Sequence, residues 1–301
     1  MAKAKEKAKL PSEGILDPEV PKDKEIEFKG EVKEGTKETT EPVETNEEDR
    51  PQLHLAAKAI LLRNMIDLCA DLVNDIKLKV RPKGVKIQAV DPAHVCLVDI
   101  DLKSGAFDEY EASDLDIGLS LEKLHNILKL AAEGNVEIDY DADEKRLIIK
   151  MDTLTRRMGI IDPEGMPDPS IPRLVTPAKF EMLAQRFLRT LNACEQITDH
   201  MRITVDKTNI ELFAELDSDT VVDKIPKELL TKLETTAKFV SLYSLDYLKI
   251  ATKGAKENIA FNMSNDNPIQ IQYTFAEGKG EVTYVLAPRI EPEDAKEEKK
   301  K

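Results

Sequence analysis

The sequence repeats itself at a spacing of about 125 residues, and this duplication constrains the fold more than any other feature. Residues 120–124 (Ser-Leu-Glu-Lys-Leu) return at 244–248 (Ser-Leu-Asp-Tyr-Leu). The strand-like run 85–91 aligns with 211–217 at an offset of 126 residues, and an earlier helical run around Leu61 repeats at the same offset. Because the three matches keep their order, the sequence predicts two similar domains in tandem.

Composition narrows the class of protein. At 301 residues and 41% hydrophobic content, the chain can hold two domains with cores of their own. It has no apolar run as long as a membrane span, and its charged start is unlike a signal peptide. Cys69, Cys96 and Cys194 stand among apolar neighbours, which predicts buried free thiols in a reducing compartment. The net charge of −14 argues against coating nucleic acid through overall charge, but not against one basic face.

Local composition divides the chain further. Residues 1–50 hold 10 basic and 15 acidic residues without apolar periodicity, so we expect a disordered charged tail. The two predicted domains span 51–160 and 178–291. Between them, five prolines and a glycine within 161–177 exclude helix and regular sheet, which predicts a connector. Residues 292–301 are expected to form a second, shorter tail.

Periodicity predicts the same elements in both halves. Helices are expected over 56–73, 121–133, 180–197 and 244–256. Ser120 is the expected N-cap of the helix that Gly134 closes. Strands are expected at 85–90, 94–102, 106–112, 135–140, 146–151, 258–263, 268–276 and 280–286. Many strands with two short helices per domain predict an α+β fold, with helices on one face of the sheets.

The catalytic inventory is thin, which disfavours an enzyme. The sequence has no Gly-rich phosphate loop, HExxH, CxxC or GxSxG motif, and no cofactor or metal is predicted. His94 has no neighbouring partner with which to act as a general base. Asp99 and Asp101 share one face of a strand, which we interpret as a solvated face rather than a cation site.

Basic residues gather on the polar sides of the four predicted helices. Solvated lysines on ordinary amphipathic helices are the simplest interpretation. Against it, basic residues recur at repeat-related positions, which indicates one shared basic surface. This surface comprises Arg63, Lys123, Lys129, Arg186, Arg189, Lys249, Lys253 and Lys256.

Two motifs resemble those of a known family. Residues 84–95 (Gly-Val-Lys-Ile-Gln-Ala-Val-Asp-Pro-Ala-His-Val) are similar to the central signature of the archaeal and eukaryotic sliding clamps, the proliferating cell nuclear antigen family. Residues 284–291 (Tyr-Val-Leu-Ala-Pro-Arg-Ile-Glu) resemble its ending, and the archaeal form is the closer match. The resemblance implies a clamp fold in which three two-domain subunits close into a six-domain ring. Residues 1–50 depart from the family, whose members usually begin at the first strand.

The resemblance also implies a function. The expected protein is a non-enzymatic processivity factor for DNA replication and repair, opened and closed around DNA by an ATP-driven clamp loader. Expected partners are duplex DNA of any sequence and DNA polymerase, flap nuclease and ligase, which carry short motifs of the form Gln-x-x-Leu/Ile-x-x-Phe-Phe. An archaeal clamp would be cytoplasmic and associated with the nucleoid, and a eukaryotic one nuclear, with no membrane partner in either case.

Three sets of residues receive roles from this resemblance. The basic surface would face the hole, where weak phosphate contacts suit sliding. A partner-peptide groove would be lined by Val90, His94, Val95, Leu97, Ile171, Pro268, Val285, Ala287 and Pro288. Edge strands would join subunits through Leu154, Arg156, Arg157, Asp219, Val221, Asp223 and Ile225. For Val90 and Leu97, a role in the strand core alone stays open.

Two other functions stay open on the sequence. The chain could be a subunit of a specialised heteromeric clamp, or an acidic scaffolding module that reuses a duplicated fold without encircling DNA. Mass in solution separates these alternatives, because a homotrimer has three times the subunit mass of 33.8 kDa.

Overall fold

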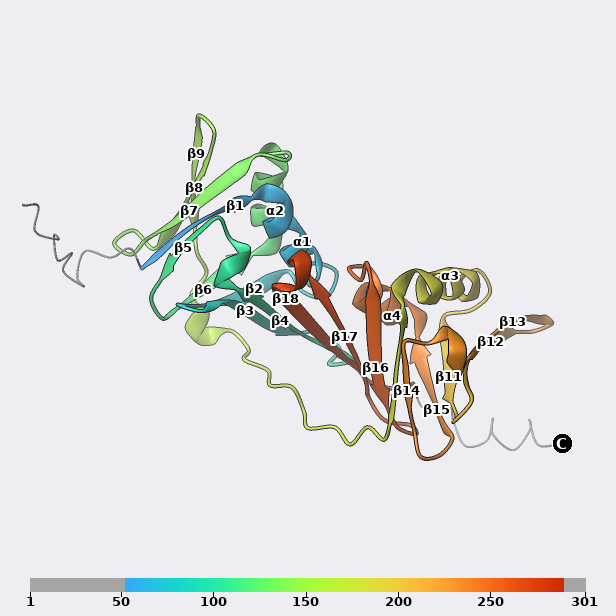
Figure 1. The fold of residues 1–301 in the computed structure, drawn as a ribbon. Helices are drawn as coiled ribbons and strands as arrows, with labels where there is room; N and C mark the ends of the chain where they lie inside the picture. The colour runs from blue at the N-terminus through green and yellow to red at the C-terminus, as the bar shows by residue number, and fades with distance from the viewer. Residues whose placement is uncertain (1–51, 290–301) are drawn as a thin grey trace, which may run out of the picture. The chain divides into compact units, whose positions relative to one another are not determined.

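The computed structural model describes residues 52–289, so both predicted tails, 1–50 and 292–301, lie outside the described residues. Residues 52–160, the first half, contain the elements β1 (Leu53–Lys58), α1 (Ala59–Asp67), β2 (Asp75–Arg81), β3 (Gly84–Val90), β4 (Cys96–Lys103), β5 (Glu109–Ala112), β6 (Leu115–Ser120), α2 (Leu121–Leu130), β7 (Asn135–Asp141), β8 (Arg146–Met151) and β9 (Leu154–Gly159). Residues 178–289, the second half, contain the same set in the same order (Figure 1). They are β10 (Ala178–Leu183), α3 (Ala184–Glu195), β11 (His200–Val205), β12 (Asn209–Leu216), β13 (Asp219–Pro226), β14 (Lys232–Glu234), β15 (Phe239–Ser244), α4 (Leu245–Thr252), β16 (Asn258–Met263), β17 (Ile269–Phe275) and β18 (Gly280–Leu286).

The strands of residues 52–289 form three antiparallel sheets. A five-stranded sheet has the order β5-β1-β7-β8-β9, and a four-stranded sheet has the order β13-β12-β11-β15. The third sheet has nine strands, in the order β14-β10-β16-β17-β18-β4-β3-β2-β6. It combines five strands of the second half with four of the first, and the pairing of β18 with β4 joins them. The predicted α+β class with antiparallel sheets is confirmed.

The four helices cover the sheets from one side, while the connector runs along the other side (Figure 1). α1 packs against α2, and α3 packs against α4. Strand residues alternate between a buried set that faces the helices and a half-exposed set that faces away, as in β3, where Val85, Ile87 and Ala89 are buried. Within residues 52–289, none of the helices combines the length and the apolar composition that a membrane-spanning helix needs. Cys69, Cys96 and Cys194 are free and buried, as predicted.

The duplication is confirmed by the matching elements, but the offset of 126 residues is wrong for the strand at 85–91 and for the helical run around Leu61. In the helices, Ala59 and Leu62 of α1 correspond to Ala184 and Phe187 of α3. In β3 the residues buried under the helices are Val85, Ile87 and Ala89, whereas in β12 they are Ile210, Leu212 and Ala214. The structural offset is therefore 125. A shift of one residue exchanges the two faces of a strand, and sequence similarity alone does not detect this exchange.

Each helix is shorter than predicted. Helices predicted to begin at 56 and 180 begin at Ala59 and Ala184, because the preceding residues alternate between buried and exposed positions in β1 and β10. The predicted helix 244–256 spans only α4. Two strands that pair with each other, β2 and β6, were absent from the predicted set. Both show the alternation that marks a strand, with Ile76, Leu78 and Val80 buried in β2, so the sequence carried a signal that the prediction missed.

The ends of α2 differ from the predicted capping. Ser120 occupies the N-cap position, but its side chain makes no capping hydrogen bond. At the other end the left-handed residue is Ala132, with φ of 49°, and not Gly134. Gly134 instead accepts a hydrogen bond from the Ala59 N–H at 2.9 Å, which ties the end of α2 to the beginning of α1.

The connector, residues 161–177, contains no regular strand or α-helix, as its prolines predict. It begins with a bridge in which the Ile161 N–H donates to the Gly118 carbonyl at 2.8 Å. Gly118 is required there, because a Cβ atom would lie 2.4 Å from the Ile161 carbonyl oxygen. Since the obstructing atoms belong to the backbone, a side chain at this position must displace the connector from β6.

We predict that Gly118→Ala lowers the free energy of unfolding by about 1–3 kcal/mol, because the added methyl group overpacks a backbone contact. Urea unfolding followed by circular dichroism measures the loss. Gly159→Ala is the matched control, since a Cβ at Gly159 meets no atom within 4 Å. Equal stability of both variants would contradict the close approach of Gly118 to the connector.

Candidate DNA-facing and partner surfaces

Six members of the predicted basic surface lie on the helices, and none of the eight is buried. Lys253 is the C-cap residue of α4, and Lys256 lies in the loop before β16, so the prediction that Lys256 continues the helix is wrong. Lys123, Lys129, Arg189, Lys249, Lys253 and Lys256 are exposed, and Arg63 and Arg186 are half-exposed. Each helix buries its opposite face: α3, for example, buries Phe187 and Leu191 while presenting its arginines. The alternation of apolar and basic positions along each helix therefore produces an apolar face on the sheet and a basic face away from it.

Acidic residues partly neutralise this basic surface. Lys249 lies 2.6 Å from a carboxylate oxygen of Glu195, and Lys253 donates to Asp71. Arg189 lies 3.9 Å from Asp223. The remaining lysines of the surface, and Arg186, make no ion pair with another described residue. Because the paired groups are largely exposed, the ion pairs are weak and can exchange for other anions.

Arg63 has a structural contact as well as an exposed side. Its guanidinium donates to the carbonyl of Ala132, just beyond the end of α2. A cation at this position interacts favourably with the negative end of the helix dipole and satisfies an unpaired carbonyl. Arg63 therefore holds α1 and α2 together, so its substitution would affect packing as well as charge.

The predicted groove residues on strands lie in one row on the face away from the helices. Val90 pairs with Leu97 across β3 and β4, and Leu97 pairs with Val285 across β4 and β18. We call these three residues the apolar row. It crosses the junction between the halves. Val285 is 6% exposed, while Val90 and Leu97 are half-exposed, so the row belongs to the outer face and not to the core beneath the helices.

The other predicted groove residues come from different elements. Val95 and Ala287 are joined by a hydrogen bond from the Ala287 N–H to the Val95 carbonyl at 2.9 Å, so the segment after β18 lies beside the segment before β4. Pro268 and Pro288 are half-exposed, as is Ile171 in the connector, and His94 is exposed.

The loop that carries His94 is organised by Asp91. One carboxylate oxygen accepts from the N–H groups of Val95 and Cys96 at 2.7 and 2.6 Å, and the other accepts from Ala93 N–H at 3.0 Å. The Tyr247 hydroxyl in α4 also donates to Asp91, at 2.8 Å. These bonds hold His94 at φ of 56°, a left-handed conformation that needs support from its surroundings. They also connect a helix of the second half to a loop of the first.

The same contacts perturb two ionisable groups. Burial opposes ionisation of Asp91, but the donors from Cys96, Tyr247, Val95 and Ala93 outweigh burial and lower its pKa below the usual 3.8. Burial and the Asp91 carboxylate raise the pKa of Tyr247 to about 12. Asp91 is thus a carboxylate, and Tyr247 a hydrogen-bond donor, throughout the physiological range.

The interpretation of Asp99 as solvated is wrong. Asp99 is 6% exposed, accepts from the Gln88 amide at 2.7 Å and lies 3.0 Å from the Lys86 ammonium, whereas Asp101 is exposed. The two aspartates do share a face, but Gln88 and Lys86 on the neighbouring strand cover only Asp99. Nowhere in residues 52–289 do three or more His, Cys, Asp or Glu side chains gather to hold a metal ion.

The residues predicted to join subunits lie on two edge strands, β9 and β13. On β9, Leu154 is 47% exposed and Arg156 and Arg157 are exposed. On β13, Asp219 is exposed, Val221 and Asp223 are half-exposed, and Ile225 is fully buried. Asp223 also accepts from the Thr190 hydroxyl of α3. Sequence reasoning omitted Val222, which is 50% exposed on β13.

Comparisons with known proteins agree with this arrangement. Residues 53–158 match the family of the proliferating cell nuclear antigen N-terminal domain. The chain is 35% identical over 237 residues to the DNA polymerase sliding clamp of Methanococcoides burtonii, covering 77% of this chain and 96% of the relative. It is also 35% identical over 239 residues to the sliding clamp of Haloarcula marismortui, with the same shares covered.

Solved structures show the same fold. A structure described as the C-terminal region of FEN-1 bound to A. fulgidus PCNA matches with a TM-score of 0.75 and 27% identity, over 80% of this chain and 99% of that chain. PCNA from Thermococcus kodakaraensis matches with a TM-score of 0.72 and 23% identity, over 79% of this chain and 100% of that chain.

We predict that Asp91→Asn lowers the free energy of unfolding by about 1–3 kcal/mol at pH 7, because one buried and three partly buried donors lose their charged acceptor. Since folding lowers the pKa of Asp91, its contribution is complete above pH 3.8 and is lost as the pH falls through the lower pKa of the folded state. Urea unfolding from pH 7 to pH 2 should show the two proteins converging in acid. Asp101→Asn is the control. A difference in unfolding free energy between the wild type and Asp91→Asn that did not change with pH would contradict the role of the Asp91 charge.

Proposed function

The chain belongs to the DNA polymerase sliding clamp family, and on that premise we propose that it acts as a sliding clamp itself. In this proposal three copies close into a ring around duplex DNA, and a loader opens the ring. The ring tethers replicative polymerase and other DNA-processing enzymes and performs no chemistry of its own. Retention on DNA then depends on topological closure, so individual DNA contacts can be weak.

One observation supports the ring. The two strands whose pairing joins the halves each have a counterpart in the repeat, and these two counterparts are not paired with each other. β9 has the place in the first half that β18 has in the second, and β13 has the place of β4. β18 and β4 pair within the chain, whereas β9 and β13 are free edges among the described strands. Pairing β9 of one subunit with β13 of the next repeats the internal contact head to tail. Such heterologous contacts close into rings when the rotation permits.

The internal junction also supplies a register for the proposed contact. The registers of the neighbouring strand pairs show which residues occupy equivalent positions in the two halves. Arg156 on β9 is equivalent to Tyr284 on β18, and Val221 on β13 is equivalent to Val98 on β4. Within the chain, Tyr284 pairs with Val98. Arg156 of one subunit would then lie opposite Val221 of the next, diagonal to two acidic residues. These are Asp219 and Asp223. The buried Ile225 would contribute backbone hydrogen bonds rather than side-chain contacts.

The basic surface is the proposed DNA contact. The helices and the residues that follow α4 place its charges on the side of the sheets away from the apolar row, so an acidic protein can present positive charge to DNA on one side. The ion pairs with Asp71, Glu195 and Asp223 keep this charge moderate. Moderate, sequence-independent attraction to phosphates favours sliding, because tight or base-specific contacts would stop the ring.

The apolar row, with Ile171, Pro268 and Pro288, is the proposed docking surface for partner peptides. An apolar surface edged by exposed backbone and one histidine suits a short peptide turn with aromatic anchors. The archaeal clamp structure with the C-terminal region of a flap nuclease supports this class of partner.

Retention on DNA tests the ring. Protein loaded by an archaeal clamp loader onto nicked circular DNA should remain bound through gel filtration at high salt, and one restriction cut that linearises the circle should release it. Alanine at Arg186, Arg189 and Lys253 should shorten polymerase products several-fold and flatten the salt dependence of loading, because up to three phosphate contacts are lost.

The matched control replaces three lysines on the other face of the nine-stranded sheet, Lys77, Lys103 and Lys179, so that net charge changes equally. Equal losses in both triple variants would contradict a basic inner face. Retention that survives linearisation would contradict topological closure.

The docking surface predicts a loss of peptide affinity. Ile171→Ala combined with Pro288→Ala should weaken a fluorescent peptide of the form Gln-x-x-Leu/Ile-x-x-Phe-Phe at least about tenfold, or 1.4 kcal/mol, by fluorescence anisotropy. Val175→Ala, in the same connector but 87% exposed, should bind like the wild type. Light scattering verifies that the trimer is intact, and undiminished binding in the double variant would place partners elsewhere.

A further inference from the structure

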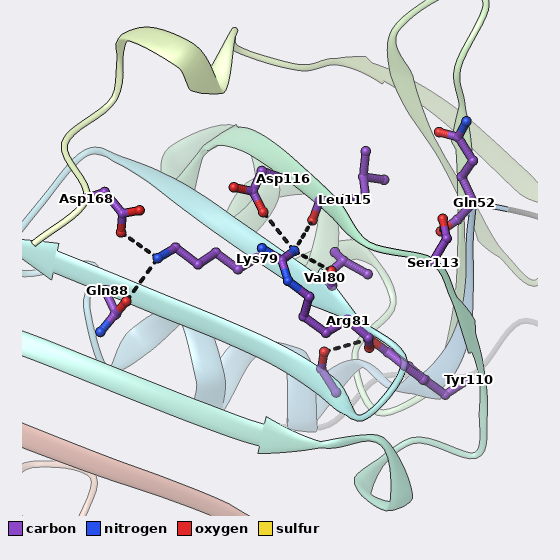
Figure 2. A network of polar contacts seen from close by, with 11 residues as sticks. Gln52, Lys79, Val80, Arg81, Gln88, Tyr110, Ser113, Leu115, Asp116 and Asp168 are labelled. Atoms are coloured by element: carbon purple, nitrogen blue, oxygen red, sulfur yellow. Dashed lines mark hydrogen bonds and ion pairs between the residues drawn. The ribbon is translucent and has the colours of Figure 1, made fainter. Parts of the chain in front are cut away.

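The connector is fastened to the sheet at its middle by one ion pair. The Lys79 ammonium on β2 lies 2.5 Å from a carboxylate oxygen of Asp168, as Figure 2 shows. Beyond Asp168, residues 169–177 make no hydrogen bond or ion pair with the rest of the described chain. Asp168 is therefore the last polar attachment of the connector before Ile171.

Lys79 is held in place independently of the connector. Its ammonium also donates to the side-chain amide oxygen of Gln88, Oε1, at 3.0 Å (Figure 2). With the connector in place, its side chain is 17% exposed. Gln88 in turn donates to Asp99 at 2.7 Å. This chain of contacts runs from β4 through β3 to β2, so the lysine is already positioned when the connector arrives. A preorganised donor loses less side-chain entropy on pairing than a free surface lysine does.

The local charge favours Asp168 as the partner. The hydrogen bond from Lys79 lowers the pKa of Asp168, burial opposes this effect, and the charges of Lys79, Lys77 and Arg81 add to it. Arg81 is occupied by Asp116 at 2.8 Å and by the Leu115 carbonyl at 3.0 Å (Figure 2). On β2, Lys79 is therefore the residue that forms an ion pair with the connector.

The ion pair is linked to the apolar row through Gln88, which accepts from Lys79. Gln88 precedes Val90 by two residues on β3, and Asp99 follows Leu97 by two residues on β4. Residues two apart on a strand share a face and are separated by about 7 Å. Ile171 follows Asp168 by three residues and can lie no more than about 11 Å from it. Fixing Asp168 therefore limits how far Ile171 can move from this part of the sheet.

We propose that the Lys79–Asp168 ion pair is a latch that positions the connector for partner peptides, an inference that rests on the proposed docking surface. The latch touches no peptide itself. It acts by holding Ile171 near the apolar row before the peptide arrives, which reduces the ordering that binding requires. Lys79 and Asp168 are positioning residues for peptide affinity.

Peptide titrations by fluorescence anisotropy test the latch. Lys79→Met keeps the apolar stem and Asp168→Asn keeps the shape, and each should weaken binding of an uncharged Gln-x-x-Leu/Ile-x-x-Phe-Phe peptide about three- to tenfold. The double variant should bind no more weakly than either single variant, because both changes open the same contact. Added salt should weaken binding to the wild type and leave the latch variants unaffected, since screening acts on the ion pair.

The matched control is the pair Lys103–Glu281, which lies at 3.2 Å on the same face and away from the connector. Lys103→Met with Glu281→Gln should leave affinity unchanged, and melting temperatures should agree among all variants. Unchanged affinity in both latch variants, with binding still lost in the Ile171 and Pro288 double variant, would overturn the latch alone. Tighter binding would overturn it too, because the pair would then hold the surface closed. A wild-type protein that binds no peptide would overturn the latch and the docking surface together.

Discussion

The pairing of β18 with β4 is the contact on which the rest of the structure depends. It converts two sheets of a duplicated chain into one sheet of nine strands. Tyr284, fully buried on β18, donates to the Leu68 carbonyl of the first half at 2.6 Å and so locks the strand to the chain beyond α1. A Cβ at Gly254 would lie 2.4 Å from Leu68, which shows how closely the two halves approach there. The apolar row exists only because this junction brings β3, β4 and β18 together.

Much of this architecture was predictable, because it rests on local patterns. The duplication, the four helices, the connector and the buried cysteines follow from periodicity and composition. The helix starts were wrong because β1 and β10 run without a break into α1 and α3, and an apolar strand that leads into an apolar helix has no boundary in composition. The face of β12 was misassigned because a strand has period two, and similarity scoring tolerates a shift that structure does not.

The functional surfaces were predictable in part. Helical spacing and the family resemblance pointed to basic residues that the structure leaves unburied and to strand residues that it places in one row, but not to the contacts that adjust them. Lys253 meets Asp71 from 182 residues away, and Lys79 meets Asp168 from 89 residues away. No local sequence pattern predicts ion pairs between residues so far apart in the chain. Asp91 is different: an aspartate followed by Pro-Ala-His is a turn-forming sequence, and its side-chain bonds to the following N–H groups could have been expected.

The two copies of the junction have diverged in chemistry. Where the internal copy has the fully buried Tyr284, the free copy has the exposed Arg156. In the proposed ring, apolar packing would hold the internal junction, whereas an exposed charge would take part in the contact between subunits. Complementary changes confined to β9 and β13 would let sister subunits choose one another without disturbing either core. If the chain forms the proposed ring, a change from identical to distinct subunits needs substitutions in two edge strands only.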